Sequence, residues 1–144
     1  MLLVSDLMTK DVFSLKKFDT LAAARSLMKL ARIRHIPIVD DENNFIGIIT
    51  HRDILSATIS KLAGIDRQTQ DELDASIPIC EIMRTDVKTA TPDMKLKDAA
   101  AILLKHKYGC LPIVDGKKLV GIITEADFLS LTISLMNALE NQED

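Results

Sequence analysis

Two places in the chain combine a threonine with an aspartate three residues later: Thr50 with Asp53, and Thr124 with Asp127. Each pair follows a Gly-Ile-Ile run and precedes a helical pattern, so each marks the junction of a strand and a helix. The aspartate could accept hydrogen bonds from the adjacent hydroxyls of a ribose, and the threonine could donate to a phosphate oxygen beside the free N–H groups of the helix. The same spacing is also a helix-capping pattern, which contributes about 1 kcal/mol without a ligand. Both interpretations are compatible with the pattern.

The two junctions belong to an internal duplication. A shift of 75 residues aligns residues 4–40 with 79–115, and a one-residue gap then aligns 45–55 with 119–129. The alignment contains fifteen identities, whereas chance predicts roughly three over this length. The gap falls in a polar turn between two apolar runs, where hairpin loops tolerate changes in length.

Each copy predicts the order β-α-β-β-α. After a short opening turn that contains Leu7 and Met8, a brief strand is expected at residues 12–15, and two strands at 36–39 and 45–49 flank the polar turn, with Pro37 near a strand start. A second helix is expected from His51, ending near Gly64.

The first helix of each copy is predicted from apolar residues that recur at three and four positions and form one buried face. In the first copy this helix begins near Thr20, and the apolar residues of the two copies are Leu21, Ala24, Leu27, Met28 and Ala31, then Leu96, Ala99, Ala100, Leu103 and Leu104.

The repeat divides the chain into a first motif at residues 1–62, a connecting segment at 63–78, a second motif at 79–136 and a C-terminal tail at 137–144. Within the connection, residues 66–76 are polar and are expected to be exposed, whether or not they are helical. The last helix has apolar residues on more than one face, which predicts a second copy of the chain as its partner: Leu129, Leu131, Ile133, Leu135, Met136 and Leu139.

Composition excludes several classes of protein. The chain has 144 residues, 47% hydrophobic and 27% charged, as expected for a globular protein. Its net charge is −3 and its basic residues form no stripe, so nucleic acid is not expected as a partner. Neither a secretory signal nor a run of transmembrane length is visible, and Cys80 and Cys110 occupy non-equivalent positions. We therefore expect reduced thiols, no membrane association and a cytoplasmic location.

The repeated motifs together resemble those of a known family. They are the turns Asp-Leu-Met and Glu-Ile-Met, the Pro-Ile-Val-Asp hairpin and the closing Gly-Ile-Ile-Thr-x-x-Asp, and with them nearly the whole chain resembles a pair of CBS domains, a Bateman module. The resemblance implies an α+β fold of two β-α-β-β-α motifs in a pseudo-twofold arrangement sharing one core. It also implies clefts that bind AMP, ADP, ATP or S-adenosylmethionine, and commonly a homodimer.

The resemblance further implies which residues would share a cleft, since in this family the Thr and Asp of one copy face the first strand and hairpin start of the other. One cleft would contain Thr124 and Asp127 with Ser14, Lys16, Arg34, His35, Ile36 and Pro37. The other would contain Thr50 and Asp53, next to His51 and Arg52, with Thr89, Thr91, Pro92, Tyr108, Gly109, Cys110 and Leu111.

The two implied clefts differ in charge. Arg34 and His35 are matched by Gly109 and Cys110 in the second copy, so the Asp127 cleft would gain cationic groups. In contrast, Glu125 follows Thr124 and disfavours added phosphate charge, whereas His51 and Arg52 follow Thr50 and favour it. The first copy also has Lys16-Lys17-Phe18 where the second has Thr91-Pro92-Asp93, a departure from the family's threonine and proline. These differences do not rank the two sites.

Other chemistry is weaker in this sequence. His106 and Cys110 are four residues apart, but a helix end and a strand start separate them, so a surface histidine and a small buried cysteine are expected instead of a metal site. His35 and Cys110 have no visible third group that would make them a nucleophilic pair.

The sequence therefore predicts a regulatory module, not an enzyme, that requires no cofactor and senses an adenine nucleotide or another adenosyl ligand. It would pass the signal to an unidentified protein partner. The alternative is a ligand-free structural module for dimerisation or interaction, in which the threonine and aspartate only cap helices.

Overall fold

The chain folds into two compact units that do not coincide with the two sequence copies. The computed structural model describes residues 1–62, 67–107 and 109–142. One unit comprises Met1–Val12, Lys88–Gly116 and Val120–Asp144, and the other Phe13–Val87 and Lys117–Leu119. We call them unit 1 and unit 2. The fold is mixed α+β with two small sheets, as the sequence predicts.

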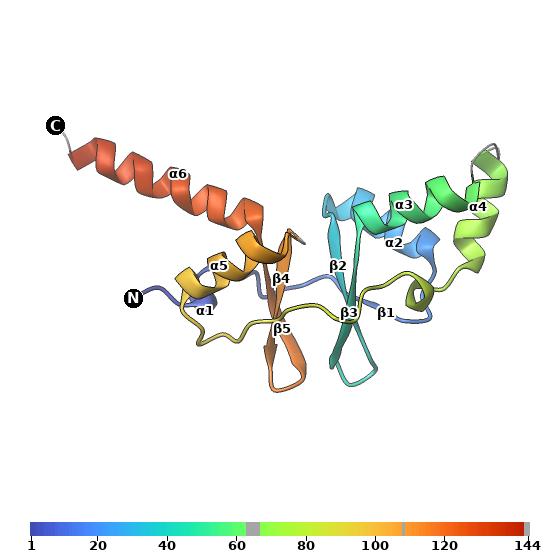
Figure 1. Ribbon diagram of the computed structural model, residues 1–144, viewed down its shortest axis with the longest axis horizontal. Helices are drawn as coiled ribbons and strands as arrows, with labels where there is room; N and C mark the ends of the chain where they lie inside the picture. The colour runs from blue at the N-terminus through green and yellow to red at the C-terminus, as the bar shows by residue number, and fades with distance from the viewer. Residues whose placement is uncertain (63–66, 108, 143–144) are drawn as a thin grey trace. The chain divides into compact units, whose positions relative to one another are not determined.

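Unit 2 contains the body of the first copy. Its sheet has the order β1-β2-β3, in which β1 is parallel to β2, and β2 is antiparallel to β3. Helices α2 and α3 pack next to the β2–β3 hairpin, and α4 packs against α2 (Figure 1). The elements are β1 (Leu15–Lys16), α2 (Leu21–Ala31), β2 (His35–Val39), β3 (Phe45–Thr50), α3 (His51–Leu62), α4 (Arg67–Ser76) and a 3-10 turn, η1 (Ile79–Glu81).

Helix α2 forms as its sequence pattern predicts. The Thr20 hydroxyl accepts a hydrogen bond from the Ala23 N–H at 3.2 Å, and this cap starts the helix. Leu21, Ala24 and Met28 are buried on one face against strand residues and form the core of unit 2. The end expected for α3 at Gly64 lies outside the described residues.

Pro37 lies within β2, so the prediction that it lies near a strand start is wrong. It pairs with Ile48, whose N–H and C=O both bond Arg84 on the far side of β3, so the Pro37–Ile48 pair exchanges no hydrogen bonds. The proline nitrogen therefore faces away from β3. On that other side β1 pairs only with Ile38 and Val39, so the missing N–H costs the sheet nothing.

The first strand is shorter and later than predicted. Only Leu15 and Lys16 pair with β2, while residues 12–14 lie outside β1 and Phe13 is exposed. In the second copy the same strand is reduced to a single parallel bridge between Ala90 and Ile113, at the positions equivalent to Leu15 and Ile38.

Unit 1 contains the body of the second copy. Val4, Leu103, Leu111 and Ile123 belong to its core, whereas Leu104 is exposed, so the expectation that Leu104 lies on the buried face is wrong. The elements that contribute to this unit are α1 (Val4–Leu7), α5 (Leu96–His106), β4 (Cys110–Asp115), β5 (Lys118–Thr124) and α6 (Glu125–Gln142), although the first two residues of β5 belong to unit 2.

The opening segments of the two copies are exchanged between the units. In unit 2, Ile48 of the first copy pairs with Arg84, which opens the second copy, through hydrogen bonds of 2.9 and 2.8 Å. In unit 1, Thr9 pairs with Ile122 through bonds of 2.9 and 3.0 Å. The four residues are equivalent pairwise in the repeat, so each opening segment completes the hairpin of the other copy.

The glycine of each Gly-Ile-Ile run allows this exchanged segment to approach. A Cβ on Gly47 would lie 2.7 Å from the Arg84 carbonyl oxygen, and a Cβ on Gly121 would lie 2.7 Å from the Met8 sulfur and 3.0 Å from the Thr9 carbonyl oxygen. Both distances below 3.0 Å are too short for a methyl group, so the run needs glycine at this point.

The segment predicted as an exposed connection is partly buried. Its helix α4 places Asp74 almost fully out of solvent, where the carboxylate pairs with Arg25 of α2 at 2.5 Å. A buried carboxylate without a cation would be costly, so this pair fixes the side of α4 that faces α2. The sequence contains no sign of the pairing because the surrounding residues are polar.

The turn between β2 and β3 is held by Asp40. Its carboxylate accepts hydrogen bonds from the Glu42 and Asn44 N–H groups, both at 2.9 Å, and from the Asn44 side chain at 3.0 Å. The bonds from Asn44, first from its backbone and then from its side chain, hold the pKa of Asp40 below its usual range.

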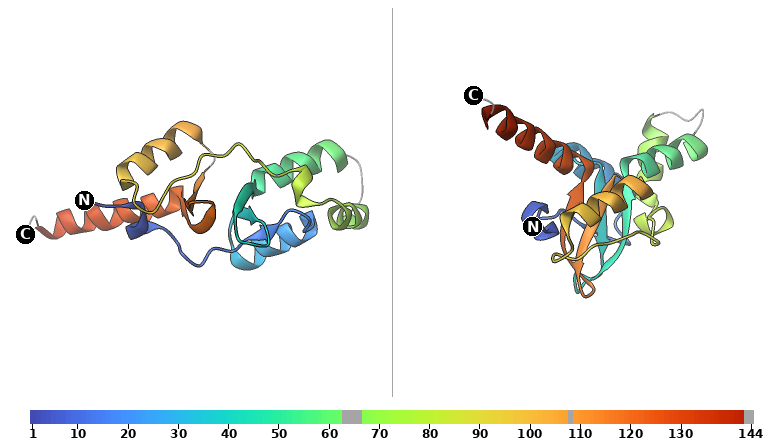
Figure 2. Two further views of the ribbon diagram at one scale, coloured as in Figure 1. Left: turned by 90° about the horizontal axis from the view of Figure 1, so that it is seen from below. Right: turned by 60° about the vertical axis from the view of Figure 1, so that its left-hand side comes forward.

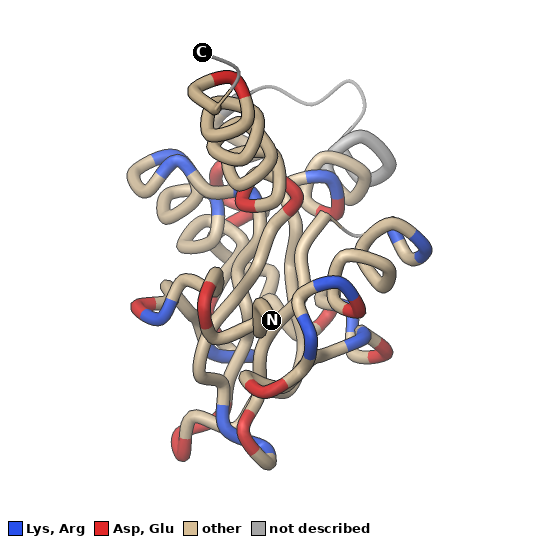
Figure 3. The backbone as a smooth tube through the Cα atoms, turned by 90° about the vertical axis from the view of Figure 1, so that its left-hand side faces the viewer, with Lys and Arg blue, Asp and Glu red and all other residues tan. Residues whose placement is uncertain are grey.

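Helix α6 extends beyond the rest of unit 1 (Figures 1 and 2). It continues without a break across the predicted boundary between the second motif, which ends at residue 136, and the tail, which starts at 137. Residues 128–139 contain no charged side chain, and Figure 3 shows the coil of α6 as largely tan, whereas blue and red positions are scattered over the rest of the backbone. None of the helices in the described ranges is both long and apolar enough to cross a membrane.

We predict that Gly47→Ala destabilises the protein by about 1–3 kcal/mol, because the new methyl group meets a backbone carbonyl that cannot move without breaking the Ile48–Arg84 pairing. Gly121→Ala should cost less, since its nearest neighbour is a flexible methionine side chain. Urea unfolding measures both, and equal or negligible losses would contradict the explanation. Gly116→Ala is the control for backbone strain without a clash, since a Cβ there meets no atom within 4 Å but the residue has a φ of +65°.

Candidate functional site

The Thr50 junction is a complete capping box. The Asp53 N–H donates to the Thr50 hydroxyl at 3.1 Å, and the Thr50 N–H donates to Oδ2 of Asp53 at 3.1 Å. The prediction of a helix cap is therefore confirmed at this junction. The cap uses one carboxylate oxygen and leaves Oδ1 for another partner.

That partner is Arg84. Its Nε and Nη2 donate to Oδ1 of Asp53 at 2.9 and 2.8 Å. The Asp53 side chain is only 8% exposed, while that of Arg84 is 49% exposed. Both oxygens of Asp53 are thus engaged, and the carboxylate is covered by the arginine that neutralises it.

The basic residues of the first copy gather around the same junction. His35 pairs with Thr50 across the β2–β3 hairpin, and the Arg34 carbonyl accepts the His51 N–H at 2.8 Å. The Arg34, His51 and Arg52 residues are exposed. Within unit 2, therefore, these basic residues lie next to the Thr50 junction along the backbone.

Lys16 binds the turn between β2 and β3 instead of the Thr50 junction. Its ammonium binds Asp41 in the turn at 2.6 Å, and this bond with the nearby charge raises the pKa of Lys16. Both side chains are exposed, so the pair adds little stability. Ser14 is half-buried just before β1.

The Thr124 junction in unit 1 has fewer side-chain hydrogen bonds than the Thr50 junction. The Thr124 N–H donates to Oδ2 of Asp127 at 2.8 Å, and the Glu125 N–H donates to the Gly109 carbonyl at 3.1 Å, as His51 does to Arg34. Over the described residues, Asp127 has no other hydrogen-bond partner or ion pair, and its side chain is partly exposed. Its Oδ1 can therefore accept hydrogen bonds from a ligand.

One substitution in the repeat explains the difference. Thr9 in the second hairpin's opening segment occupies the position of Arg84 in the first, with the same backbone pairing. A threonine cannot supply the two N–H donors that close Asp53. The sequence analysis missed Arg84 because its proximity to Asp53 depends on the exchange of opening segments.

Several other predicted residues are buried. The side chains of Ile36 and Leu111 belong to the cores of their units, and Pro37 and Cys110 are also buried. In this conformation they can contact a ligand only through their backbones. The burial of Cys110 agrees with its prediction as a small buried cysteine.

The remaining predicted residues of the second copy lie in unit 1. Thr89 is half-buried, the Thr91 hydroxyl donates to Asp93 at 2.6 Å, and the Pro92 carbonyl accepts the Ser5 N–H at 2.9 Å. Tyr108 lies outside the described residues. The grouping of one copy's junction with residues of the other copy stays a prediction.

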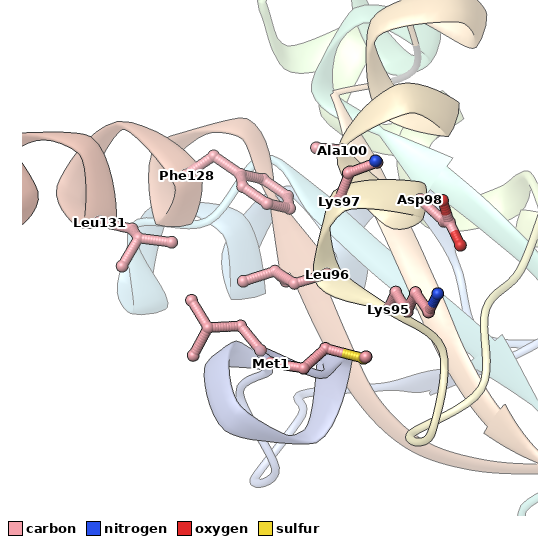
Figure 4. Close-up of a pocket in the computed structure, with 9 residues that line it drawn as sticks. Met1, Lys95, Leu96, Lys97, Asp98, Ala100, Phe128 and Leu131 are labelled. Atoms are coloured by element: carbon pink, nitrogen blue, oxygen red, sulfur yellow. The ribbon is translucent and has the colours of Figure 1, made fainter.

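An open pocket of about 530 Å³ lies in unit 1, and none of the predicted site residues lines it. Figure 4 shows Phe128 and Leu131 of α6 beside Leu96, whereas Asp98 points away from them. The other lining residues are Met1, Leu2, Lys95, Lys97 and Ala100. Within the part of the chain that the structure describes, no cluster of His, Cys, Asp and Glu could hold a metal ion, and Cys80 and Cys110 form no disulfide.

The chain belongs to the CBS domain family. The family model matches residues 4–60 and again residues 79–133, which confirms the resemblance and the duplication. The pair of motifs is a regulatory module. Among relatives, protein MJ1225 of Methanocaldococcus jannaschii is 33% identical over 128 residues, which are 89% of this chain but only 42% of that protein. The chain therefore spans less than half the length of this relative.

Solved structures have the same fold. The Vibrio cholerae protein AcuB is 39% identical, with a TM-score of 0.80 over 98% of this chain and 97% of that chain. The CBS domain pair of protein MJ0100 is 27% identical, with a TM-score of 0.76 over 92% of this chain and 96% of that one. It was solved in complex with 5′-methylthioadenosine and S-adenosyl-L-methionine.

The two aspartates should respond differently to loss of charge. Asp53→Asn should destabilise the protein by about 1–2 kcal/mol, because Arg84 loses its ionic partner at a largely buried oxygen; half-exposure of the arginine moderates the loss. Asp127→Asn keeps an oxygen for the Thr124 N–H and should change stability by less than about 0.5 kcal/mol. Urea unfolding of the two variants measures the difference, and equal losses would contradict it.

Proposed function

We propose that this chain is a regulatory module that binds an adenosine derivative through its Thr-x-x-Asp junctions. The observation that carries the proposal is the position of the aspartate, which the threonine N–H holds at the first turn of a helix. A ribose offers two adjacent hydroxyl donors, and a carboxylate is the side chain that accepts both. The adenosyl ligands of the similar MJ0100 pair support this class of ligand.

The rest of the proposed site follows the assignment made from the family resemblance. The helix N-terminus would face the polar end of the ligand, where its free N–H groups favour negative charge. Glu125, next to Thr124, opposes that charge, so the candidate ligands include S-adenosylmethionine and methylthioadenosine as well as AMP, ADP and ATP.

Regulation requires that the ligand stabilise one conformation more than another. The proposed ligand is therefore a signal, not a cofactor, and the response is passed to a separate protein or domain. We infer no turnover of the ligand.

A second role is supported by α6. Leu129, Ile133 and Leu139 are each at least 60% exposed on a helix whose residues 128–139 carry no charge. Exposed apolar surface of this kind favours association, and a second copy of the chain is the proposed partner. Dimerisation could transmit the ligand signal or could be the module's whole role.

Ligand binding should raise the thermal stability of the protein. At about 100 times its dissociation constant, a ligand that binds only the folded state stabilises it by about 2.7 kcal/mol. Thermal melts with millimolar AMP, ADP, ATP, S-adenosylmethionine and methylthioadenosine measure the shift. The double variant Asp53→Ala/Asp127→Ala should lose it.

Asp98→Ala is the matched control, because Asp98 also lies in the first turn of a helix but follows Lys95 instead of a threonine. Its ligand-induced shift should equal that of the wild type. A wild-type protein that no adenosyl ligand stabilises would refute the proposed function, and consumption of the ligand would point to an enzyme.

Association through α6 should depend on its apolar face. Ile133→Glu replaces an exposed apolar side chain with a charged one and should convert a dimer into a monomer. Light scattering coupled to size-exclusion chromatography measures the mass. Ser130→Glu, at an exposed polar position of the same helix, should leave the mass unchanged, and a monomeric wild type would refute the dimer.

A further inference from the structure

The two junctions have the same threonine and aspartate but differ in what the aspartate can still bind. Asp53 accepts one hydrogen bond from Thr50 and two from Arg84, whereas Asp127 accepts only the bond from Thr124 within the described ranges. The Asp53 side chain is also nearly buried, while Asp127 is partly exposed. A ribose could reach Asp127 directly, but at Asp53 it would have to displace Arg84.

That displacement would be unfavourable. The guanidinium approaches Oδ1 with two donors, at 2.9 and 2.8 Å, and carries the charge that neutralises the carboxylate. Ribose hydroxyls would replace two charge-assisted bonds with bonds from neutral donors. Arg84 is also held in place through its backbone, because its N–H donates to the Ile48 carbonyl and its carbonyl accepts the Ile48 N–H.

The repeat shows what the junction is like without this arginine. Thr9 pairs with Ile122 as Arg84 pairs with Ile48, so the backbone at the two positions has the same hydrogen bonds. An arginine at position 9 would start from an equivalent point and could reach Asp127. One residue therefore distinguishes the closed junction from the open one.

We propose that Arg84 is a built-in competitor that closes the Asp53 junction, so that each chain binds a single adenosyl ligand, at the Asp127 junction. This inference rests on the proposed function and adds the number of ligands and the residue that sets it. Arg84 is thus a specificity-determining residue that acts by occupying the ribose acceptor.

Isothermal titration of the full chain with S-adenosylmethionine and, separately, with AMP tests the inference. The wild type should bind one ligand per chain, Arg84→Thr two, and Thr9→Arg none. The double variant Thr9→Arg/Arg84→Thr should again bind one, but at the other junction. Its binding should be lost with Asp53→Ala and kept with Asp127→Ala, the reverse of the wild type.

Two further variants keep the test decisive if a substitution harms folding. Thr9→Gln has similar bulk to arginine without the charge and should keep one ligand, and Arg84→Ala should bind two, as Arg84→Thr does. Two ligands on the wild type, or weaker binding after loss of Arg84, would overturn the inference while leaving the proposed function intact. No binding by any variant would refute the proposed function itself.

Discussion

A carboxylate that caps a helix three residues after a threonine is the contact on which both the fold and the proposed chemistry depend. At Thr50 the threonine and the aspartate exchange two hydrogen bonds where β3 ends and α3 begins. At Thr124 only one of those two bonds is made. The cap fixes the aspartate with one oxygen toward the backbone. The other oxygen is then directed to whatever lies in front of the helix, which is an arginine in one copy and an open position in the other.

Duplication produced two similar junctions, but the opening segments made them unequal. Because each segment completes the hairpin of the other copy, a residue change at its end acts on a distant aspartate and not on its own. Arg84 and Thr9 occupy the same place in the repeat and give opposite surroundings to Asp53 and Asp127. Divergence after duplication could therefore change one junction while leaving both strand–helix caps in place.

Much of this arrangement can be predicted from the sequence, because helix periodicity, turn residues and the repeat are local properties. The β-α-β-β-α order of the first copy, the start of α2 near Thr20 and the family follow from them. Contacts between distant segments do not. The burial of Asp74 depends on Arg25 of another helix, and the place of Pro37 inside β2 is tolerated because β1 pairs only with Ile38 and Val39 on the side that the proline nitrogen faces. The partner of Asp53 escaped prediction for the same reason.

The exchange of opening segments also sets an order of events during synthesis on the ribosome. Residues 13–87 include nearly all of unit 2 and can begin to fold as soon as they emerge. Residues 1–12 are made before them, yet Thr9 must wait for Ile122, 113 positions later, before it can pair. At about 5–20 residues per second this delay is roughly 6–23 s. During this interval the backbone groups of Thr9 lack the partner that they have in the folded unit.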